Sequence, residues 1–518
     1  MKRFGFALVA TLLSSVAYAF AFPPLRLRVL AFVALVPFLL ALRAVGPRAA
    51  LLLCWVLSIV TSYFVADALP AAVETYFLQP PLVSHLFSVA IWTLTGAVYC
   101  MLFGVAYRAI ARWPSVWTPI LCGAIWAGTE LLRGRLFTGS SFFVGNPWAL
   151  LGYSQVGGLR LPQVAALGGP YAISFVVMCL NASVAELLMA RRDAASLRTA
   201  LRGAALGGVP LLLALVYGEG ALRGSTRDVG GAAVEVAVVQ GDVDLGSVWR
   251  SEFYGQNLEV YLRGTLEAAS RGAPRIVVWP EAALTFFLAD EPAYQASIAR
   301  VLAAKDLELV VGGPSRAAGD DRFYNSVFLV GPDGTIRARY DKQYLVPFSE
   351  FFPFAGLDLL RRRFERVRVF EHGPADTELL PTRAGLAGVL TCNEAMLPEV
   401  AGRRVAEGAE ILVSPSNDSW IRADAWAEQM FDMVMLRAIE QRRFLVRAST
   451  SGPSAIVDPW GHVVARTQPF SRDVAWGIVR ARSEASLYGR VGDAFGFVCV
   501  AVLAGALWYG RSGRRRSE

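Results

Sequence analysis

The sequence predicts a polytopic α-helical membrane bundle joined to one large α/β domain, and three observations carry this prediction. The chain has 518 residues, 55% of them hydrophobic, and its mean hydropathy of +0.44 is too high for soluble domains alone. Long apolar runs fill residues 1–222 and return at 490–510, before a basic tail at 511–518. Between them, over 228–485, the apolar runs are short and alternate with turns, as in a layered α/β domain.

Apolar runs long enough to cross a bilayer as helices, roughly 20 residues each, occur at about eight places. About seven fall in the N-terminal region, and the whole set is 4–22, 25–44, 49–68, 86–107, 117–133, 167–190, 202–219 and 491–509. The fifth run is the weakest, since Pro119 lies near its start and Glu130 near its end. Ala-Tyr-Ala at 17–19 resembles a signal-peptide cleavage site, but the second run follows so closely that we expect a retained hairpin.

The distribution of lysine and arginine predicts the orientation of the helices. In the short connections between the apolar runs, most of these residues fall on one side, namely Lys2, Arg3, Arg43, Arg48, Arg108, Arg112, Arg191, Arg192, Arg198, Arg202, Arg511 and Arg514 to Arg516. The loop 69–85 has none and shares its side with segment 220–490, so the α/β domain should lie outside the cytoplasm. In a bacterial inner (cytoplasmic) membrane that side is the periplasm. The exceptions are Arg26, Arg28, Arg133 and Arg135.

The net charge of +8 gives no reason to expect nucleic-acid binding. The arginines cluster at the ends of apolar runs and form no single basic face, which is typical of membrane topology. The α/β domain of roughly 260 residues is a size that one core can support. Its expected strands are 234–240, 275–279, 307–312, 326–330, 387–391, 411–414, 444–448 and 454–457, with helices at 249–270, 291–304 and 425–442.

Two residues at strand ends are candidates for chemistry. Five of the six cysteines lie in apolar runs, and only Cys392 lies in the α/β domain, directly after the apolar run 387–390. An inert buried cysteine is an equally good interpretation of this position alone. Glu281 follows the apolar strand 276–279, with Pro280 between them to end the strand. A carboxylate there suits a general base, although an ordinary solvated acid fits this position equally well.

Lys342 is the third candidate. Only three of the chain's 50 lysine and arginine residues are lysine, and Lys342 lies among aromatic and aliphatic neighbours, where an ammonium could stabilise an oxyanion. A salt bridge to Asp341 is the alternative. The three histidines, His85, His372 and His462, occupy no comparable strand end, which disfavours a Cys-His pair. The domain has no Cys/His ligand cluster, so we expect no metal and no cofactor.

Taken together, these residues resemble a known pattern. Trp279-Pro-Glu281, Lys342 with Val346-Pro-Phe348 and Glu350, and Cys392-Asn-Glu394 resemble the Glu-Lys-Cys pattern of the nitrilase superfamily, which implies an αββα sandwich. A polytopic membrane part before this domain and one helix after it resemble the apolipoprotein N-acyltransferase family over nearly the whole chain. Further similar segments are 145–148, 151–155, 239–241 with Trp249, 416–420, 447–452 and 454–458.

The resemblance also implies supporting residues. Glu350 is expected beside the lysine and the base, and Glu394 near the nucleophile, although surface acids remain the plain alternative. Trp249 and Trp148 are expected to support the site or bind substrate, unless Trp148 belongs to an interfacial aromatic belt. Two departures from the family put substrate fit in question: Asn393 follows the nucleophile where an aromatic residue is common, and Ser349 stands where glycine is frequent.

The activity that the resemblance implies is a two-step acyl transfer. Cys392, activated by Glu281, takes an acyl chain from a phospholipid donor as a thioester, while Lys342 stabilises the oxyanion. The α-amino group of the lipid-modified N-terminal cysteine of a diacylglyceryl-modified apolipoprotein then accepts the chain. We expect a monomer in contact with membrane lipid.

Two other functions stay open at this point. A membrane-tethered nitrilase-like amidase would let water resolve the thioester, and an apolar route from the bilayer to Cys392 would argue against it. Phe351, Phe352 and Phe354 could line such a route, although they could equally belong to the core. A non-enzymatic transporter or scaffold with a degenerate outer domain would carry intramembrane charges along a pathway, and the predicted helices contain few.

Overall fold

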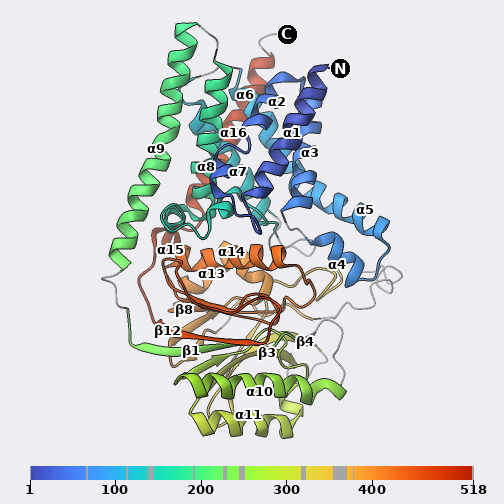
Figure 1. Cartoon of the computed structure of the whole chain (residues 1–518), viewed down its shortest axis with the longest axis vertical. Coiled ribbons are helices and arrows are strands. Elements are labelled where there is room, and N and C mark those ends of the chain that lie inside the picture. The colour runs from blue at the N-terminus through green and yellow to red at the C-terminus, as the bar shows by residue number, and fades with distance from the viewer. Residues whose placement is uncertain are drawn as a thin grey trace.

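The computed structural model places a helical bundle against an α/β part, with both chain termini at the far end of the bundle (Figure 1). It describes the whole chain apart from residues 1, 66–67, 113–114, 137, 139–144, 191–192, 226–229, 244–250, 317–321, 354–369, 377 and 516–518.

The bundle consists of helices, most of which the apolar runs predict. Its elements are α1 (Lys2–Phe20), α2 (Val36–Ala44), α3 (Pro47–Phe64), α4 (Leu69–Thr75), α5 (Pro81–Trp92), α6 (Val98–Ile110), α7 (Thr118–Arg135), α8 (Ala165–Met189), α9 (Ala194–Ser225) and α16 (Ala494–Arg515). Within the described residues, six helices are long and apolar enough to cross a membrane: 2–20, 47–64, 81–110, 161–189, 194–225 and 494–511. The chain is a membrane protein, as predicted.

Two of the eight expected spans differ from the prediction. The run 25–44 is not one helix: it forms a 3-10 turn at Arg28–Phe32 and then the nine-residue α2. The run 117–133 does form a helix, α7, but it is not among the six apolar ones because Glu130, Arg133 and Arg135 make it too polar. Most of α7 is buried within the protein, so that neighbouring helices surround it instead of lipid.

The α/β part is an αββα sandwich, which confirms the predicted fold class. Its strands are β1 (Ala233–Gln240), β2 (Ile276–Val278), β3 (Glu308–Arg316), β4 (Phe323–Val330), β5 (Ile336–Asp341), β6 (Leu380–Thr382), β7 (Gly385–Val389), β8 (Ile411–Ser416), β9 (Leu445–Ser449), β10 (Ala455–Val457), β11 (Val463–Arg466) and β12 (Asp473–Arg480). They form two six-stranded sheets, in the orders β12-β1-β2-β3-β4-β5 and β11-β10-β9-β8-β7-β6. The sheets pack face to face over a valine-rich and alanine-rich core.

Helices cover both outer faces of the sandwich. Helices α10 (Tyr254–Arg271) and α11 (Pro292–Lys305) cover the first sheet on the side away from the bundle (Figure 1). Helices α13 (Pro398–Ala406) and α14 (Asp424–Gln441) cover the second sheet and lie between it and the bundle. The apolar side chains of α14 belong to the same core cluster as those of the bundle, so the two parts share one continuous interior.

Ion pairs fasten the bundle to the sandwich and explain the exceptions in the arginine distribution. Arg26 donates to Glu428 at 2.7 Å and to Asp432 at 2.9 Å, both on α14. Arg135 pairs with Asp493 at 2.7 Å. Arg28 and Arg133 likewise donate to backbone carbonyls within the protein. These arginines therefore serve protein contacts and carry little information about membrane orientation.

Candidate active site

The three predicted catalytic residues each follow a strand of the sandwich. Glu281 follows β2, Lys342 follows β5 and Cys392 follows β7, and Glu281 and Lys342 meet in direct contact. Because the two sheets face each other, residues at these strand ends converge although they are far apart in sequence. Close approach at Glu281 requires Gly312 on β3, where a β-carbon would lie 2.6 Å from the Glu281 Cα atom.

Lys342 is the centre of a buried charge cluster. Its Nζ atom lies 3.0 Å from Glu281 Oε1 and 2.9 Å from Glu350 Oε2, and its side chain is 1% exposed. Burial alone would lower the pKa of Lys342, but the carboxylates of Glu281 and Glu350 outweigh it and raise that pKa well above its usual value. The ammonium therefore stays charged and can stabilise negative charge that develops beside it.

Two amides that sequence reasoning missed hold these carboxylates in place. The Asn325 side chain donates to Glu281 Oε1 at 2.8 Å and to Glu350 Oε1 at 2.6 Å. The backbone N–H of Asn417 donates to Glu281 Oε2 at 2.9 Å. Asn325 directly precedes the expected strand 326–330. The sequence signal that could have identified it is an amide side chain at the start of a buried strand.

An ion pair made by the next residue, Asp418, supports Asn417. Arg447 donates to Asp418 at 2.7 Å, and both side chains are fully buried. Ser449 donates to the same carboxylate oxygen at 2.7 Å, and Thr450 donates to the Asn417 side chain at 2.9 Å. The segments 416–420 and 447–452, similar to the family in sequence, thus fix the loop that contacts Glu281.

Cys392 lies at the start of a 3-10 turn, Cys392–Met396, in a backbone conformation that is rare for a side-chain-bearing residue. Its φ of 51° is in the left-handed region, and such conformations concentrate at functional sites. Burial and the negative charge of Glu281 raise the pKa of the Cys392 thiol, whereas the positive charge of Lys342 lowers it. These interactions place the thiol in the same electrostatic environment as Glu281 and Lys342, as a protonated group at neutral pH.

Glu394 connects the turn at Cys392 to the loop that follows Lys342. Its Oε1 atom accepts from the Tyr340 hydroxyl at 2.7 Å and from the backbone N–H of Gln343 at 2.8 Å. Its Oε2 atom accepts from the backbone N–H of Thr391 at 2.9 Å, within a capping box. Glu394 is fully buried and lies two residues after Cys392, while Glu350 contacts Lys342.

The other predicted residues have different outcomes. Asn393 donates to the Tyr344 carbonyl at 3.0 Å, and its Oδ1 atom is buried with no partner among the described residues. Trp148 does not join the cluster: it is buried in the bundle, donates to the Val65 carbonyl at 3.2 Å and stacks on Trp426. It is therefore not a lipid-facing belt residue. Trp249 lies outside the described residues.

An apolar groove joins the bundle to the loops of the site. It is lined by Leu69, Ala72, Val73, Tyr76, Phe77, Gln79, Val83, Phe87, Val346, Pro347, Phe348, Ser349 and Trp420. Ser349 directly precedes Glu350, and Trp420 belongs to the loop of Asn417, so two loops that line the groove also carry residues of the charge cluster or in contact with it. The ring of Phe352 packs on Phe348, whereas Phe351 packs on His372 and Phe354 lies outside the described residues.

Comparisons with known proteins match both parts of the chain. The carbon-nitrogen hydrolase family model matches residues 235–484, and the apolipoprotein N-acyltransferase N-terminal domain model matches residues 14–183. An apolipoprotein N-acyltransferase of Geobacter metallireducens is 32% identical over 94% of this chain and 92% of its own length. One of Pseudomonas syringae pv. tomato is 28% identical over 93% and 92%.

A solved structure is also similar to the sandwich. It is an amidase of the nitrilase superfamily from Nesterenkonia AN1, in a variant form, with 15% identity and a TM-score of 0.39. The similarity covers 52% of this chain and 97% of that one.

Proposed function

Because this chain belongs to the apolipoprotein N-acyltransferase family, we propose that Cys392 transfers an acyl chain from a phospholipid to the α-amino group of a lipid-modified N-terminal cysteine of an apolipoprotein. The chain is an acyltransferase by family. The buried contact of Lys342 with Glu281 and Glu350, together with the electrostatic effect of Glu281 and Lys342 on the Cys392 thiol, is the observation that supports the proposal.

The first half-reaction uses Glu281 as the base. Its carboxylate takes the thiol proton, which the raised pKa of Cys392 makes necessary at neutral pH. The sulfur attacks the ester carbonyl carbon, and Lys342 stabilises the tetrahedral oxyanion. The carbon–oxygen bond to the glycerol then breaks, the leaving alkoxide takes the proton from Glu281, and lysophospholipid departs. A thioester on Cys392 remains.

The second half-reaction reverses these proton movements. The α-amino group of the acceptor attacks the thioester carbonyl and gives one proton to Glu281. The carbon–sulfur bond breaks, the sulfur recovers that proton, and an amide is released. Lys342 again faces the oxyanion, so one charge cluster serves both steps.

The apolar groove favours transfer over hydrolysis. Two acyl chains must reach the cluster from lipid, and the groove is lined by bundle residues of α4 and α5 on one side and by the loop of Glu350 on the other. Tyr76 and Trp420 contact each other across it with ring centroids 6.2 Å apart. A hydrolase acting on small polar amides has no need for such a wall.

We further propose that the protein acts as a monomer in a bacterial inner membrane with the sandwich in the periplasm. The arginine distribution supports this orientation once the arginines that pair with the protein itself are set aside. The domain limits of 1–222, 228–485 and 490–510 remain part of this proposal.

Mass spectrometry of the purified protein tests the proposal. After incubation with phospholipid, the peptide containing Cys392 should gain the mass of one acyl group, and Cys392→Ala should gain none. A chase with a diacylated lipopeptide should remove the adduct and give a triacylated product. Removal by water alone at the same rate would favour the hydrolase, and absence of any adduct in a correctly inserted protein would favour the scaffold.

A further inference from the structure

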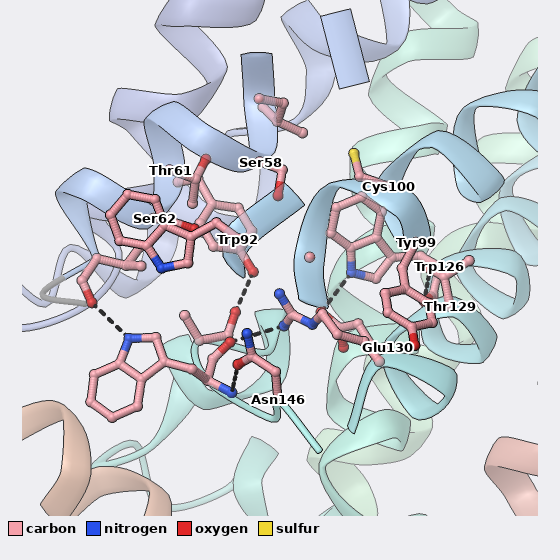
Figure 2. A pocket seen from close by; sticks show the side chains of 17 residues that line it. Ser58, Thr61, Ser62, Trp92, Tyr99, Cys100, Trp126, Thr129, Glu130 and Asn146 are labelled. Carbon is pink, nitrogen blue, oxygen red and sulfur yellow. Dashed lines mark hydrogen bonds between the residues drawn. The ribbon is translucent and has the colours of Figure 1, made fainter. Parts of the chain in front are cut away.

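A second cavity lies inside the bundle, apart from the charge cluster (Figure 2). Its volume is about 70 Å³, several times the room that one bound water needs. The lining residues are Tyr18, Leu57, Ser58, Thr61, Ser62, Val65, Trp92, Gly96, Tyr99, Cys100, Trp126, Thr129, Glu130, Arg133, Asn146, Trp148 and Ala149. None belongs to the sandwich, so this cavity and the Cys392 cluster are separate sites.

Two opposite charges on α7 face the cavity with unsatisfied atoms. Glu130 is 4% exposed, and its Oε1 atom accepts from the Trp126 indole at 2.9 Å and the Leu151 backbone at 2.7 Å. Its Oε2 atom has no hydrogen-bond partner of normal geometry among the described residues, although the Ser174 hydroxyl interacts with the carboxylate. Arg133 donates to the Trp148 carbonyl, while its buried Nε has no partner in the same part of the chain.

A buried polar atom without a partner is costly, and Arg133 Nε is such an atom among the described residues, so a ligand that accepts a hydrogen bond from Arg133 would lower this cost. The free hydroxyl oxygen of Thr61 is also buried without a partner among the described residues. The wall opposite α7 includes Gly96 in a π-helical turn, Thr93–Ala97, between α5 and α6. Such turns occur often at functional sites, and Gly96 allows Ser58 to approach within 3.0 Å of where a β-carbon would lie.

The cavity lies near the end of the bundle that meets the sandwich. Arg135, two residues beyond Arg133, pairs with Asp493 and approaches Glu399 on α13 of the sandwich. Glu130 is five residues from Arg135, which corresponds to about 7.5 Å along the helix. Glu130 and Arg133 are therefore near the end of the bundle that meets the sandwich, which we expect to lie at the depth of the lipid headgroups.

We propose that this cavity holds the headgroup of a resident phospholipid that carries both a phosphate and an ammonium group, with the phosphate on Arg133 and the ammonium on Glu130. Side chains three residues apart on a helix have Cβ atoms about 5–6 Å apart, which suits two charges linked by a two-carbon chain. Trp92 and Trp126 also line the cavity, and an indole can bind an ammonium group through its ring face. This lipid is not the acyl donor, and the inference does not rest on the proposed function.

Lipid binding to full-length Cys392→Ala protein in detergent tests the inference, because no lipid is consumed in this variant. Native mass spectrometry would compare phosphatidylethanolamine, phosphatidylglycerol and free phosphoethanolamine. Adding Glu130→Gln or Arg133→Gln should weaken phosphatidylethanolamine binding about tenfold, since each removes one charge-assisted contact. Glu186→Gln is the matched control: Glu186 is a bundle carboxylate that already pairs with Arg43 and does not line the cavity.

Three outcomes would overturn the inference. Equal binding to all variants would show that the cavity holds only water. Equal binding of phosphatidylglycerol, which lacks the ammonium group, would show that Glu130 does not bind an ammonium group. Binding of free phosphoethanolamine as tight as that of the lipid would replace the membrane source by a soluble one. Acyl-adduct formation in the protein with native Cys392 is measured independently, so failure of either proposal leaves the other standing.

Discussion

Gly312 lies directly against the backbone of Glu281, so close that a β-carbon on Gly312 would be 2.6 Å from the Glu281 Cα atom and 2.8 Å from the Pro280 carbonyl. A separation this small leaves no room for any side chain. Strand β3 thus sets the position of the proposed base through backbone contact, without a hydrogen bond from a side chain of its own.

Gly312→Ala should therefore lower kcat by about 100-fold, because a shift of roughly 1 Å in a reacting group is enough for a loss of that size. Acyl-adduct formation on Cys392 in a single turnover measures the effect. Gly255→Ala is the control, since its β-carbon would lie 3.7 Å from the nearest atom, the Tyr294 hydroxyl. Equal rates for the two variants would mean that Glu281 does not need its present position.

Replacing Lys342 should harm both stability and activity. Lys342→Met leaves Glu281 and Glu350 buried together without their cation, and loss of one partner of a buried pair costs about 3–5 kcal/mol. Thermal unfolding and adduct formation should both decline. Lys305→Ala, which removes an exposed lysine at the end of α11, should change neither. A stable but inactive Lys342→Met protein would show that the charge is needed only for the reaction.

The thiol of Cys392 should react slowly with iodoacetamide at pH 8 and faster as the pH rises. Burial and the charge of Glu281 raise its pKa, so little thiolate exists near neutral pH. Glu281→Gln removes that negative charge, which should lower the pKa of Cys392 and increase alkylation. The same variant should lose acyl transfer by about 100- to 10,000-fold, because the general base is gone.

Mass spectrometry of the Cys392 peptide measures alkylation and acylation in one digest. The two rates should change in opposite directions in Glu281→Gln. A parallel fall in both would show that Glu281 serves the structure of the site and not the transfer of the proton.

The fold could be predicted wherever apolar runs are continuous. All eight expected strands are present, and the four that were missed, β5, β6, β11 and β12, are the outermost strands of the two sheets. An edge strand pairs with a neighbour on one side only. The first part of β5 and most of β11 are exposed, so neither strand gives an apolar run in the sequence. Their presence depends on the neighbouring strand, which a local pattern does not contain.

The candidate site, like the fold, could be predicted only where local sequence patterns indicate it. Glu281, Lys342 and Cys392 each follow an expected or observed strand, and lysine and cysteine are rare in this chain, so local patterns reveal these residues. Asn325 and the backbone of Asn417 contribute through geometry alone, since nothing in either segment indicates that both donate to one carboxylate. Trp148 is the opposite case: a similar sequence segment suggested that it supports the site, and the fold places it in the bundle, stacked on Trp426.

The apolar groove should determine which donors the enzyme accepts. Phe87→Ala shortens its bundle wall and should lower kcat/KM about tenfold for a phospholipid with long chains, with little change for a short-chain donor. Leu82→Ala removes a similar apolar side chain from the same helix α5, at an exposed position outside the groove. If both variants lose activity equally, or if Phe87→Ala affects both donors alike, the groove does not carry the acyl chain.

The folded state should lose stability as the pH rises through 7. Burial raises the pKa of Asp432 to about 7, with Glu428 acting in the same direction and Arg26 and Arg28 against it. The folded protein thus binds a proton that the unfolded chain has already lost, so this contribution to stability is complete below about pH 4. This contribution to stability disappears as the pH passes 7.

Asp432→Asn cannot ionise, and its apparent unfolding midpoint should change less between pH 6 and pH 8 than that of the native protein. Asp424→Asn, at the start of the same helix and exposed, should retain the native pH dependence. If Asp432→Asn loses stability with pH as steeply as the native protein, another group titrates at the junction. Because Arg26 and α14 join the membrane helices to the second sheet, a flatter profile would identify this buried carboxyl as the pH-sensitive contact between the two parts.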